Sequence, residues 1–382
     1  MEWKEVTLGD FMQCNPKRTI KKGQKARKIT MDLLIPHSKT IRNWNYEPYS
    51  GGAKFQNGDT IMARITPCLE NGKHAFVSIL NKGEIAYGST EYFVFCGKED
   101  VSDNDFVYYL TKAPLFRDTA IKSMVGSSGR QRAQMDVLEN LKMLVPKDIS
   151  DQRRIASILS SLDRKIELNN KINADLEEMA QAIFKNWFVD FEPFKNGKFV
   201  DSELGMIPEG WKVVKLGDFF PVKTGKKDAN TASVNGKYPF FSCSQNALCT
   251  DSYSFDCDAI LVAGNGDFNV KWYSGKFDAY QRTYVLIPYN KKLLALLYYV
   301  VKRNLLTITS KARGSVIRFI TKGNLTDFEF AIPRDLENNE IVDVFKSINE
   351  KIFANNKENS RLSLLRDTLL PRLMSGEIEV PE

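Results

Sequence analysis

The chain has 382 residues, too many for one ordinary domain, and 43% of them are hydrophobic, enough for packed cores. This composition excludes a disordered or a fibrous protein. No apolar run reaches the roughly 18 residues of a membrane helix, and the first residues, MEWKEVTLGDF, lack an apolar signal core. We therefore expect neither a membrane span nor secretion, and a cytoplasmic location.

The net charge of +7 is distributed in blocks. Residues 1–147 carry 22 Lys and Arg against 16 Asp and Glu, and residues 211–334 carry 18 against 9. Residues 148–210 and 335–382 are acidic, with 8 against 12 and 6 against 10. Basic surface on two separate modules is typical of a protein that binds a polyanion. Solvated lysines on ordinary domains would explain the charge alone equally well.

The motifs of common enzymes are absent from the sequence. The six cysteines include no C-x-x-C pair, and His37 and His74 are the only histidines, which leaves little for a metal site or a catalytic triad. There is no P-loop, no G-x-S-x-G and no H-E-x-x-H, and Gly264-Asn-Gly266 is only half of a dinucleotide fingerprint. This pattern favours a binding protein without catalysis or a metal of its own.

The chain contains an internal repeat. The first element, Trp3–Phe11, recurs as Trp211–Phe219 with the shared letters W-K-x-V-x-L-G-D-F. Four further matches follow in the same order: Gly58–Ala63 with Cys257–Ala263, Thr90–Phe95 with Gln281–Leu286, Tyr108-Tyr109 with Tyr298-Tyr299, and Leu144–Asp148 with Ala331–Asp335. Five matches in register indicate a tandem duplication.

Each copy begins with a module that mixes strands, loops and some helix. Short apolar runs such as Thr60–Ile65 and Tyr92–Phe95 alternate with turn signals such as Asn57-Gly58. We predict one mixed α/β domain over residues 1–147 and a second over residues 211–334, so that the fold class is α+β.

Each module is followed by a long predicted helix, over residues 148–187 and over residues 335–376, with a tail to residue 382. Apolar residues recur with a heptad period, and both helices place Lys at the second d position and Asn at the third a position. The a positions are Ile155, Leu162, Asn169, Leu176, Ile183 and Ile341, Ile348, Asn355, Leu362, Leu369; the d positions are Ile158, Lys165, Ile172, Met179 and Val344, Lys351, Glu358, Leu365.

Matching polar interruptions predict that the two helices pair with each other, because buried polar residues reject other registers. In a duplicated chain the natural arrangement is an antiparallel coiled coil related by a pseudo-two-fold axis. The alternative is two separate amphipathic helices, each covering its own module. Residues 188–210, with four aromatic residues and two prolines, read as a linker.

Basic and polar loops are the candidate contacts to nucleic acid. The segment Val125–Arg132 is a glycine- and serine-rich turn that ends in Arg-Gln-Arg. Arg pairs bidentately with guanine and Gln with adenine, whereas a solvated turn is the alternative for each loop. The candidate residues are Arg64, Asn71, Lys73, Ser128, Arg130, Gln131, Arg132, Lys226, Lys227, Arg313, Ser315 and Arg318.

Together these elements resemble the specificity subunit of type I restriction–modification systems. The resemblance covers essentially the whole chain in the right order. It is carried by Trp3–Phe11 and its repeat, Gly58–Lys73, Ser89–Val94, Gln152–Leu159, Leu204–Trp211 and Arg366–Gly376. The second copy departs from the first by replacing the Thr-Pro-Cys-Leu-Glu-Asn-Gly loop with Gly264–Phe268, so its base-reading loops cannot be inferred from the first.

The resemblance implies two target-recognition domains, each reading one half of a bipartite site on double-stranded DNA. The two helices would hold the domains apart and dock two modification subunits. Those subunits would bind S-adenosylmethionine and methylate adenine, and restriction subunits would add ATP- and Mg²⁺-dependent cleavage, so this chain would not be an enzyme. The alternatives are a fused methyltransferase or nuclease with unrecognised motifs, and a coiled-coil scaffold with no role on DNA.

Overall fold

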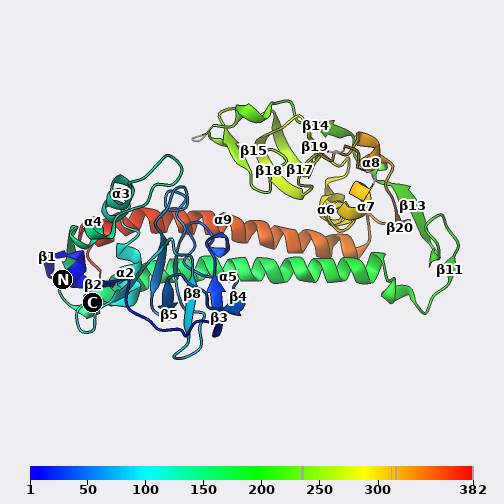
Figure 1. Cartoon of the computed structure of the whole chain (residues 1–382). Coiled ribbons are helices and arrows are strands. Elements are labelled where there is room, and N and C mark those ends of the chain that lie inside the picture. The colour runs from blue at the N-terminus through cyan, green and yellow to red at the C-terminus, as the bar shows by residue number, and fades with distance from the viewer. Residues whose placement is uncertain (234–235, 311, 315, 381–382) are drawn as a thin grey trace. The chain divides into compact units, whose positions relative to one another are not determined.

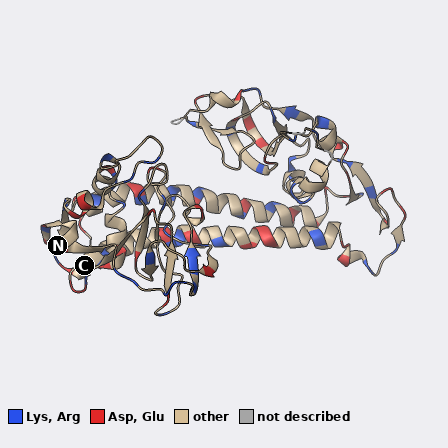
Figure 2. Ribbon diagram, in the orientation of Figure 1, with Lys and Arg blue, Asp and Glu red and all other residues tan. Residues whose placement is uncertain are grey.

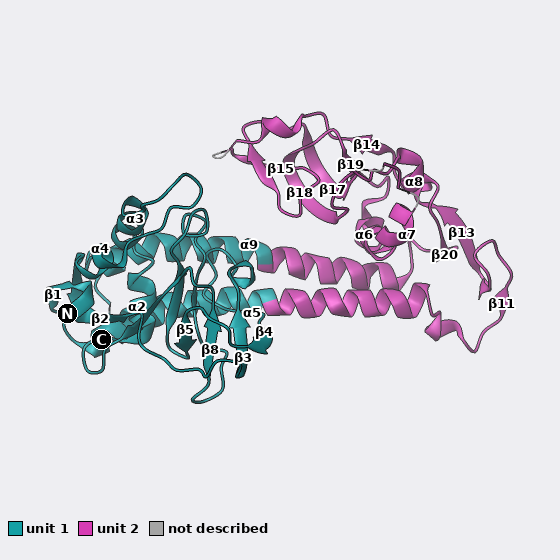
Figure 3. Ribbon diagram, in the orientation of Figure 1, with its two compact units in different colours: residues 1–170, 356–382 teal, residues 171–355 magenta. Residues whose placement is uncertain are grey.

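The computed structural model describes residues 1–233, 236–310, 312–314 and 316–380 (Figure 1). The chain divides into two compact units (Figure 3): Met1–Asn170 with Asn356–Glu382, and Lys171–Asn355. We call them unit 1 and unit 2. None of the helices within the described ranges combines the length and the apolar character needed to cross a bilayer.

Unit 1 contains the first module, which is built on two four-stranded sheets and one strand pair. The first sheet has the order β2 (Met12–Cys14), β9 (Tyr92–Gly97), β6 (Thr60–Ala63), β7 (His74–Phe76), and the second the order β4 (Asn45–Pro48), β3 (Lys25–Ile29), β8 (Ile85–Gly88), β5 (Lys54–Gln56). The pair is β1 (Trp3–Thr7) with β10 (Lys142–Pro146). The helices are α1 (Leu8–Phe11), η1 (Met31–Leu33), α2 (Asn104–Leu110), α3 (Pro114–Lys122) and α4 (Met135–Glu139).

Unit 2 contains the second module, whose main sheet has six strands. Their order is β14 (Val222–Thr224), β19 (Thr283–Leu286), β17 (Phe255–Ala263), β18 (Val270–Ala279), β15 (Tyr238–Phe241), β16 (Leu248–Thr250). Two strand pairs accompany it, β13 (Trp211–Lys215) with β20 (Glu329–Pro333) and β11 (Phe199–Val200) with β12 (Ile207–Pro208). The helices are η2 (Glu192–Phe194), η3 (Leu216–Asp218), η4 (Ala229–Thr231), η5 (Lys291–Leu293), α6 (Leu294–Arg303), α7 (Leu305–Ser310) and α8 (Lys322–Thr326).

The repeated Trp-to-Phe motif forms the same structure in both copies. Strand β1 pairs antiparallel with β10 so that Trp3 lies opposite Pro146. Strand β13 pairs with β20 in the same register, with Trp211 opposite Pro333. The strand pair closes each module, because it joins the module's first strand to its last. The tandem duplication and the mixed α/β character of both modules are confirmed.

The two long helices are α5 (Ile149–Phe188) and α9 (Glu340–Met374), and they run antiparallel within each unit. In unit 1, Asp163 of α5 contacts Arg366 of α9 and Asn169 contacts Asn359. In unit 2, Asn173 contacts Asn355 and the Phe184 ring lies against the Phe345 ring. Residue numbers therefore rise along one helix as they fall along the other. Each pair of half-helices shares a hydrophobic core with the module of its own unit, which is why the units divide the helices.

The predicted asparagines are buried between the helices, each within its own unit. Asn169 and Asn355 are 1% and 2% exposed. In unit 1 the Asn169 amide donates to Asn359 Oδ1 at 2.9 Å, and in unit 2 the Asn355 amide donates to Asn173 Oδ1 at 2.8 Å. These two bonds are the same interaction in the two copies, because residues of α5 and α9 correspond with an offset of 186 (Asn169 to Asn355, Asn173 to Asn359). The bonds favour one register of the pair.

The d positions predicted from the heptad pattern are displaced by one residue from the positions that are buried between the helices. Met179 and Leu365, at predicted d positions, are 53% and 46% exposed, whereas the following residues Ala180 and Arg366 are 0% and 6% exposed. Lys165 is likewise outside the seam, with an ion pair to Glu358 at 3.3 Å. The heptad pattern gave the wrong d positions because it assumes that buried residues are apolar. Here polar side chains, Arg366 among them, are buried, and large apolar side chains face outward.

The segment 188–210 contains ordered aromatic contacts around Trp211. The rings of Phe188, Phe191 and Phe194 lie 5.6, 5.2 and 5.1 Å from the Trp211 ring, centroid to centroid. Edge-to-face pairs of this kind stabilise by about 0.5–1.5 kcal/mol each beyond their buried area. They attach the end of α5 to the first strand of the second module.

Candidate nucleic-acid interface

Three loops of unit 1 meet at the end of the sheet where β6 stops and β9 starts. They are the loop 64–73 after β6, the turn 89–91 before β9, and the hairpin 125–132. The Arg64 N–H donates to the Glu91 carbonyl at 2.9 Å, and the Arg64 carbonyl accepts from Ala133 at 2.8 Å. The Thr66 N–H donates to the Gln131 carbonyl at 3.0 Å. These backbone bonds hold the three loops as one frame.

Unit 2 has the same backbone frame. The Gly264 N–H donates to the Arg282 carbonyl at 2.8 Å, and the Gly264 carbonyl accepts from Ile320 at 2.9 Å. The Gly266 N–H donates to the Arg318 carbonyl at 3.0 Å. The bridge between Val125 and Arg132 therefore corresponds to the bridge between Arg313 and Phe319, and each module presents its loops on an equivalent scaffold.

The side chains on the two frames carry different charges. Glu91 in unit 1 corresponds to Arg282 in unit 2, and Arg132 corresponds to Phe319. Arg64, at the end of β6, corresponds to Gly264. The two surfaces therefore have different chemistry on one backbone, as is required of modules that recognise different ligands of one class.

Glu91 neutralises two of the predicted contact residues in unit 1. Arg132 donates to its carboxylate from Nε and from Nη2 at 2.8 Å, and Arg64 Nε lies 4.0 Å away. The hydrogen bond from Arg132 holds the pKa of Glu91 below its usual range. The Arg64 guanidinium also lies over the Phe93 ring, 4.9 Å from its centroid. Arg64 and Arg132 thus hold the loops together.

Of the five other predicted residues of unit 1, one stabilises a loop and four are available to contact a ligand. Lys73 Nζ donates to the Met31 carbonyl at 2.6 Å and fixes the loop 64–73. The side chains of the remaining four make no hydrogen bond to the described part of the chain. Gln131 is half-buried and the other three are exposed. These four are Asn71, Ser128, Arg130 and Gln131.

In unit 2 the predicted basic residues lie on adjacent loops. Lys227 pairs through its backbone with Tyr280, next to the turn that leads to Arg282, and Lys226 is exposed. Arg313, which pairs through its backbone with Phe319, is exposed, whereas Arg318 donates from Nη2 to the Thr309 carbonyl at 3.0 Å. Ser315, the remaining predicted residue, lies outside the described residues.

Sequence reasoning missed Arg282. Its side chain is exposed and has no hydrogen-bond partner among the residues described. The signal was present, because the repeat aligns Thr90–Phe95 with Gln281–Leu286 and so places Glu91 opposite Arg282. A single Arg next to a predicted strand gives no functional signal in the sequence. The structure shows its role by placing it beside the other loops of the frame. Searching the described residues finds no group of His, Cys, Asp and Glu arranged to hold a metal ion.

We expect Arg130→Ala and Arg313→Ala to weaken specific DNA binding by about 1–3 kcal/mol each if these arginines read guanine bidentately. Melting temperatures should stay unchanged, because both side chains are exposed and make no hydrogen bond to the described residues. Fluorescence anisotropy on cognate and scrambled duplexes over a salt series measures the effect. A phosphate contact would instead weaken binding to all sequences and lower the salt slope by about one. Unchanged affinity in both variants would remove these loops from the interface.

Comparison with known proteins gives the family. A family model described as the type I restriction modification DNA specificity domain matches residues 1–178 and again residues 208–364. The chain is 38% identical to the EcoDI specificity subunit of Escherichia coli over 178 residues, which cover 46% of this chain and 40% of that subunit. That match spans less than half of the EcoDI subunit.

Two further relatives and one solved structure extend over more of the chain. The MjaIX specificity subunit of Methanocaldococcus jannaschii is 29% identical, covering 73% of this chain and 70% of that one, and the HindI specificity subunit of Haemophilus influenzae is 24% identical, covering 99% and 100%. The crystal structure of a type I system S subunit from M. genitalium has the same fold, with a TM-score of 0.53 at 15% identity over 98% of this chain and 96% of that one. The duplicated family match, read with the two equivalent loop frames, shows that this chain belongs to the family of type I restriction–modification DNA specificity domains.

Proposed function

We propose that this chain is the DNA-recognition subunit of a type I restriction–modification complex, and that each module reads one half of a bipartite site. The observation that carries the proposal is the pair of equivalent loop frames with different side chains. Phosphate contacts position a protein on DNA, whereas side chains at base edges specify the sequence. One backbone frame with two side-chain sets is therefore suited to reading two unlike half-sites.

The distribution of charge supports contact with DNA. The module regions carry the surplus of Lys and Arg, and the regions that contain the long helices are acidic. Figure 2 shows Asp and Glu interspersed with Lys and Arg along both helices. Lys and Arg that neutralise phosphates release counterions and supply the sequence-independent part of the affinity. The modules, not the helices, carry the charge expected of a DNA-binding surface.

Apolar side chains on the outer faces of the helices support a docking role. Leu168, Leu364 and Leu365 in unit 1 are 52%, 69% and 46% exposed. Met179 in unit 2 is 53% exposed. Large exposed apolar residues on an otherwise charged helix are typical of a protein–protein contact. We assign these faces to two modification subunits.

We assign catalysis and its cofactors to partner subunits. In this proposal the modification subunits bind S-adenosylmethionine and methylate adenine, and restriction subunits use ATP and Mg²⁺. This chain contributes positioning of the DNA and of the partners. The complex acts beside the DNA in the cytoplasm.

The proposal is tested by methyl transfer with and without partners. The chain is incubated with labelled S-adenosylmethionine and DNA, alone and with the modification subunits encoded beside it. We expect label on DNA only when both are present, and methylated adenines only within one two-part sequence. Methyl transfer by the chain alone would show a fused methyltransferase. Methylation by the partners that is the same with and without this chain would show a scaffold with no role on DNA.

A further inference from the structure

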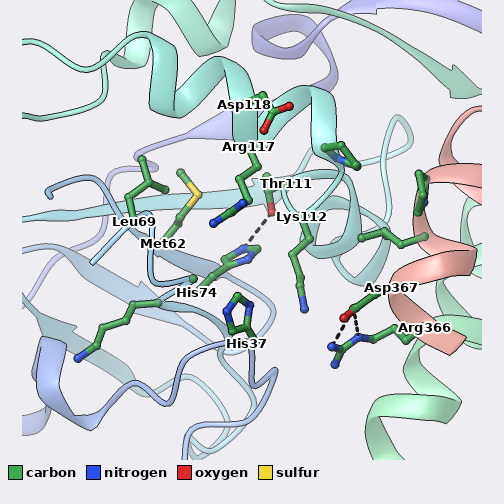
Figure 4. Close-up of a pocket in the computed structure, with 15 residues that line it drawn as sticks. His37, Met62, Leu69, His74, Thr111, Lys112, Arg117, Asp118, Arg366 and Asp367 are labelled. Atoms are coloured by element: carbon green, nitrogen blue, oxygen red, sulfur yellow. Dashed lines mark hydrogen bonds and ion pairs between the residues drawn. The ribbon is translucent and has the colours of Figure 1, made fainter. Parts of the chain in front are cut away.

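Unit 1 contains a cavity of about 250 Å³ beside the last turns of α9 (Figure 4). Its walls come from the loop 64–73, from the segment between α2 and α3, and from α9. Ligand pockets for drug-sized molecules measure about 300–1,000 Å³, so this cavity suits a smaller guest. The polar residues that line it include His37, His74, Lys112, Arg117, Arg366 and Asp367.

Lys112 is the unusual member of this set. Its ammonium group is buried and has no hydrogen-bond partner among the residues that the structure describes. Burial lowers the pKa of Lys112 to about 8. The ammonium lies over the Tyr108 ring, 5.4 Å from its centroid, but this contact supplies no counter-ion and no hydrogen-bond acceptor. A buried charge without a hydrogen-bonded partner is costly, and proteins normally pair or neutralise it. The side chain lines the cavity, so a guest there can supply the missing partner.

The second copy shows the paired form of the same lysine. Tyr108-Tyr109 and Lys112 correspond to Tyr298-Tyr299 and Lys302. Lys302 Nζ donates to Glu177 Oε1 at 2.7 Å and to the Tyr298 hydroxyl at 3.0 Å. With the helix offset of 186, the residue of α9 that corresponds to Glu177 is Ser363, which carries no charge. The first copy has therefore kept the lysine without its internal counter-ion.

Two further donors face the same cavity. Arg117 uses Nη2 to bond the Glu70 carbonyl at 2.7 Å, so most of its N–H groups are not used by that bond. The His37 imidazole makes no hydrogen bond to the described residues and lies against Gly72, where an added Cβ would be 2.5 Å from the ring. Gly72 thus leaves the space that the His37 ring occupies. His74 is committed elsewhere, with Nε2 3.0 Å from the Thr111 hydroxyl.

None of the carboxylates near the cavity is hydrogen-bonded to Lys112 among the described residues, although Asp163 and Asp367 are close enough to raise its pKa by charge. Asp367 accepts a hydrogen bond from Arg366 Nε at 2.9 Å, and Arg366 is also paired with Asp163. Asp118, which also lines the cavity, is exposed and makes no hydrogen bond to Lys112. The lining carries four cationic side chains, Lys73, Lys112, Arg117 and Arg366, against Asp118 and Asp367, and it stays positive when Asp163 beside Arg366 is counted. This charge favours an anionic guest.

We propose that this cavity binds a small free oxyanion, phosphate or a short carboxylate, with the Lys112 ammonium as its counter-ion and Arg117 and His37 as further donors. A DNA backbone phosphate does not fit, because it is joined to a sugar on each side and the Lys112 amine is buried. The bound anion joins the end of α9 to the loop that carries Asn71, and so it stabilises a loop of the candidate interface. The inference rests on unit 1 alone and holds whether or not the chain reads DNA.

Calorimetric titration of the full chain with sodium phosphate and with sodium succinate, at ionic strength matched with sodium chloride, tests the proposal. We expect binding of at least one of the two anions. Lys112→Met, which keeps the length of the side chain and removes its charge, should weaken that binding roughly ten- to a hundredfold, as expected for a hydrogen bond to a charged group. The matched control is Lys122→Met on α3, an exposed lysine away from the cavity walls, which should bind as the unchanged protein does.

A second variant keeps the test decisive if Lys112→Met fails to fold. Ser363→Glu introduces the acid that the second copy has, so it should raise the melting temperature in chloride and remove the stabilisation by the anion. Anion binding that is the same in Lys112→Met, or in Ser363→Glu, as in the unchanged protein would overturn the proposal. So would the absence of heat from both anions in the unchanged protein. A failure of DNA recognition would affect neither measurement.

Discussion

Replacing Arg366 with alanine should lower the free energy of unfolding by about 3–5 kcal/mol, because it leaves a buried carboxylate without its partner. Arg366 Nη1 donates to Asp163 Oδ1 at 2.6 Å, and both side chains are 7% exposed. The Tyr109 hydroxyl donates to the other oxygen of Asp163 at 2.6 Å. The Asp163 carboxylate of α5 thus connects to α9 and to α2. Removing Arg366 removes the ion pair to α9 and leaves only the hydrogen bond from Tyr109 of α2.

The second copy supplies the compensating variant. Asp163 and Arg366 correspond to Asn349 and Ala180, a pair with no charge, and the Asn349 amide donates to the Phe345 carbonyl at 2.9 Å. The double variant Asp163→Asn with Arg366→Ala should therefore be more stable than Arg366→Ala alone. Because the two side chains are in contact, a double-mutant cycle should show coupling of roughly 0.5–3 kcal/mol.

Urea unfolding followed by circular dichroism measures Arg366→Ala, Asp163→Asn and the double variant, with Asp367→Ala as control. Asp367 also accepts from Arg366, but its side chain is 60% exposed, so its loss should cost no more than about 1 kcal/mol. If Asp367→Ala and Arg366→Ala lowered the free energy of unfolding equally, burial of the Arg366–Asp163 pair would not explain the effect. An unfolding curve with more than one transition would require the transitions to be compared separately.

Exchanging residues 1–147 for the matching module of a relative should replace one half of the methylated sequence completely and leave the other half unchanged. The exchanged segment is structurally closed, because β1 and β10 both lie within it and pair from Trp3 to Pro146. Its loop frame, from Arg64 to Ala133, is also contained within it. Base contacts specify locally, so the new half-site should follow the new loops.

The donor must keep the contacts that the module makes with α5. Tyr109 donates to Asp163, Lys39 donates to Ser160 at 2.9 Å, and Arg42 pairs with Glu167 at 2.9 Å. A relative with matching residues there should give a folded hybrid, which a cooperative melt checks. Single-molecule sequencing of the methylated DNA then shows both half-sites at once. The reciprocal exchange of residues 211–334 is the control and should change only the other half. A change in both halves from either exchange would mean that the modules do not read independently.

The sequence by itself determined the architecture of the chain. The repeat of Trp3–Phe11 at Trp211 predicted two equivalent modules, and the structure confirms them through one strand register. Hydrophobic periodicity predicted the two long helices, and their matching asparagines predicted that they pair. These features are legible because periodicity and repetition are local patterns, set by which residues must face a core.

Only the tertiary structure decided what the individual polar residues do. Arg130 and Arg132 look alike in the sequence. Arg132 is held by Glu91, 41 residues away, whereas the Arg130 side chain is exposed and makes no hydrogen bond within the described ranges. Lys112 and Lys302 occupy matching places. Lys302 is hydrogen-bonded to Glu177 of α5, whereas Lys112 has no hydrogen-bond partner in the part of the chain that the structure describes. Arg366 is buried between the helices because it pairs with Asp163, which lies 203 residues earlier in the chain. The charge state and availability of a side chain depend on its neighbours in space, which no local pattern in the sequence specifies.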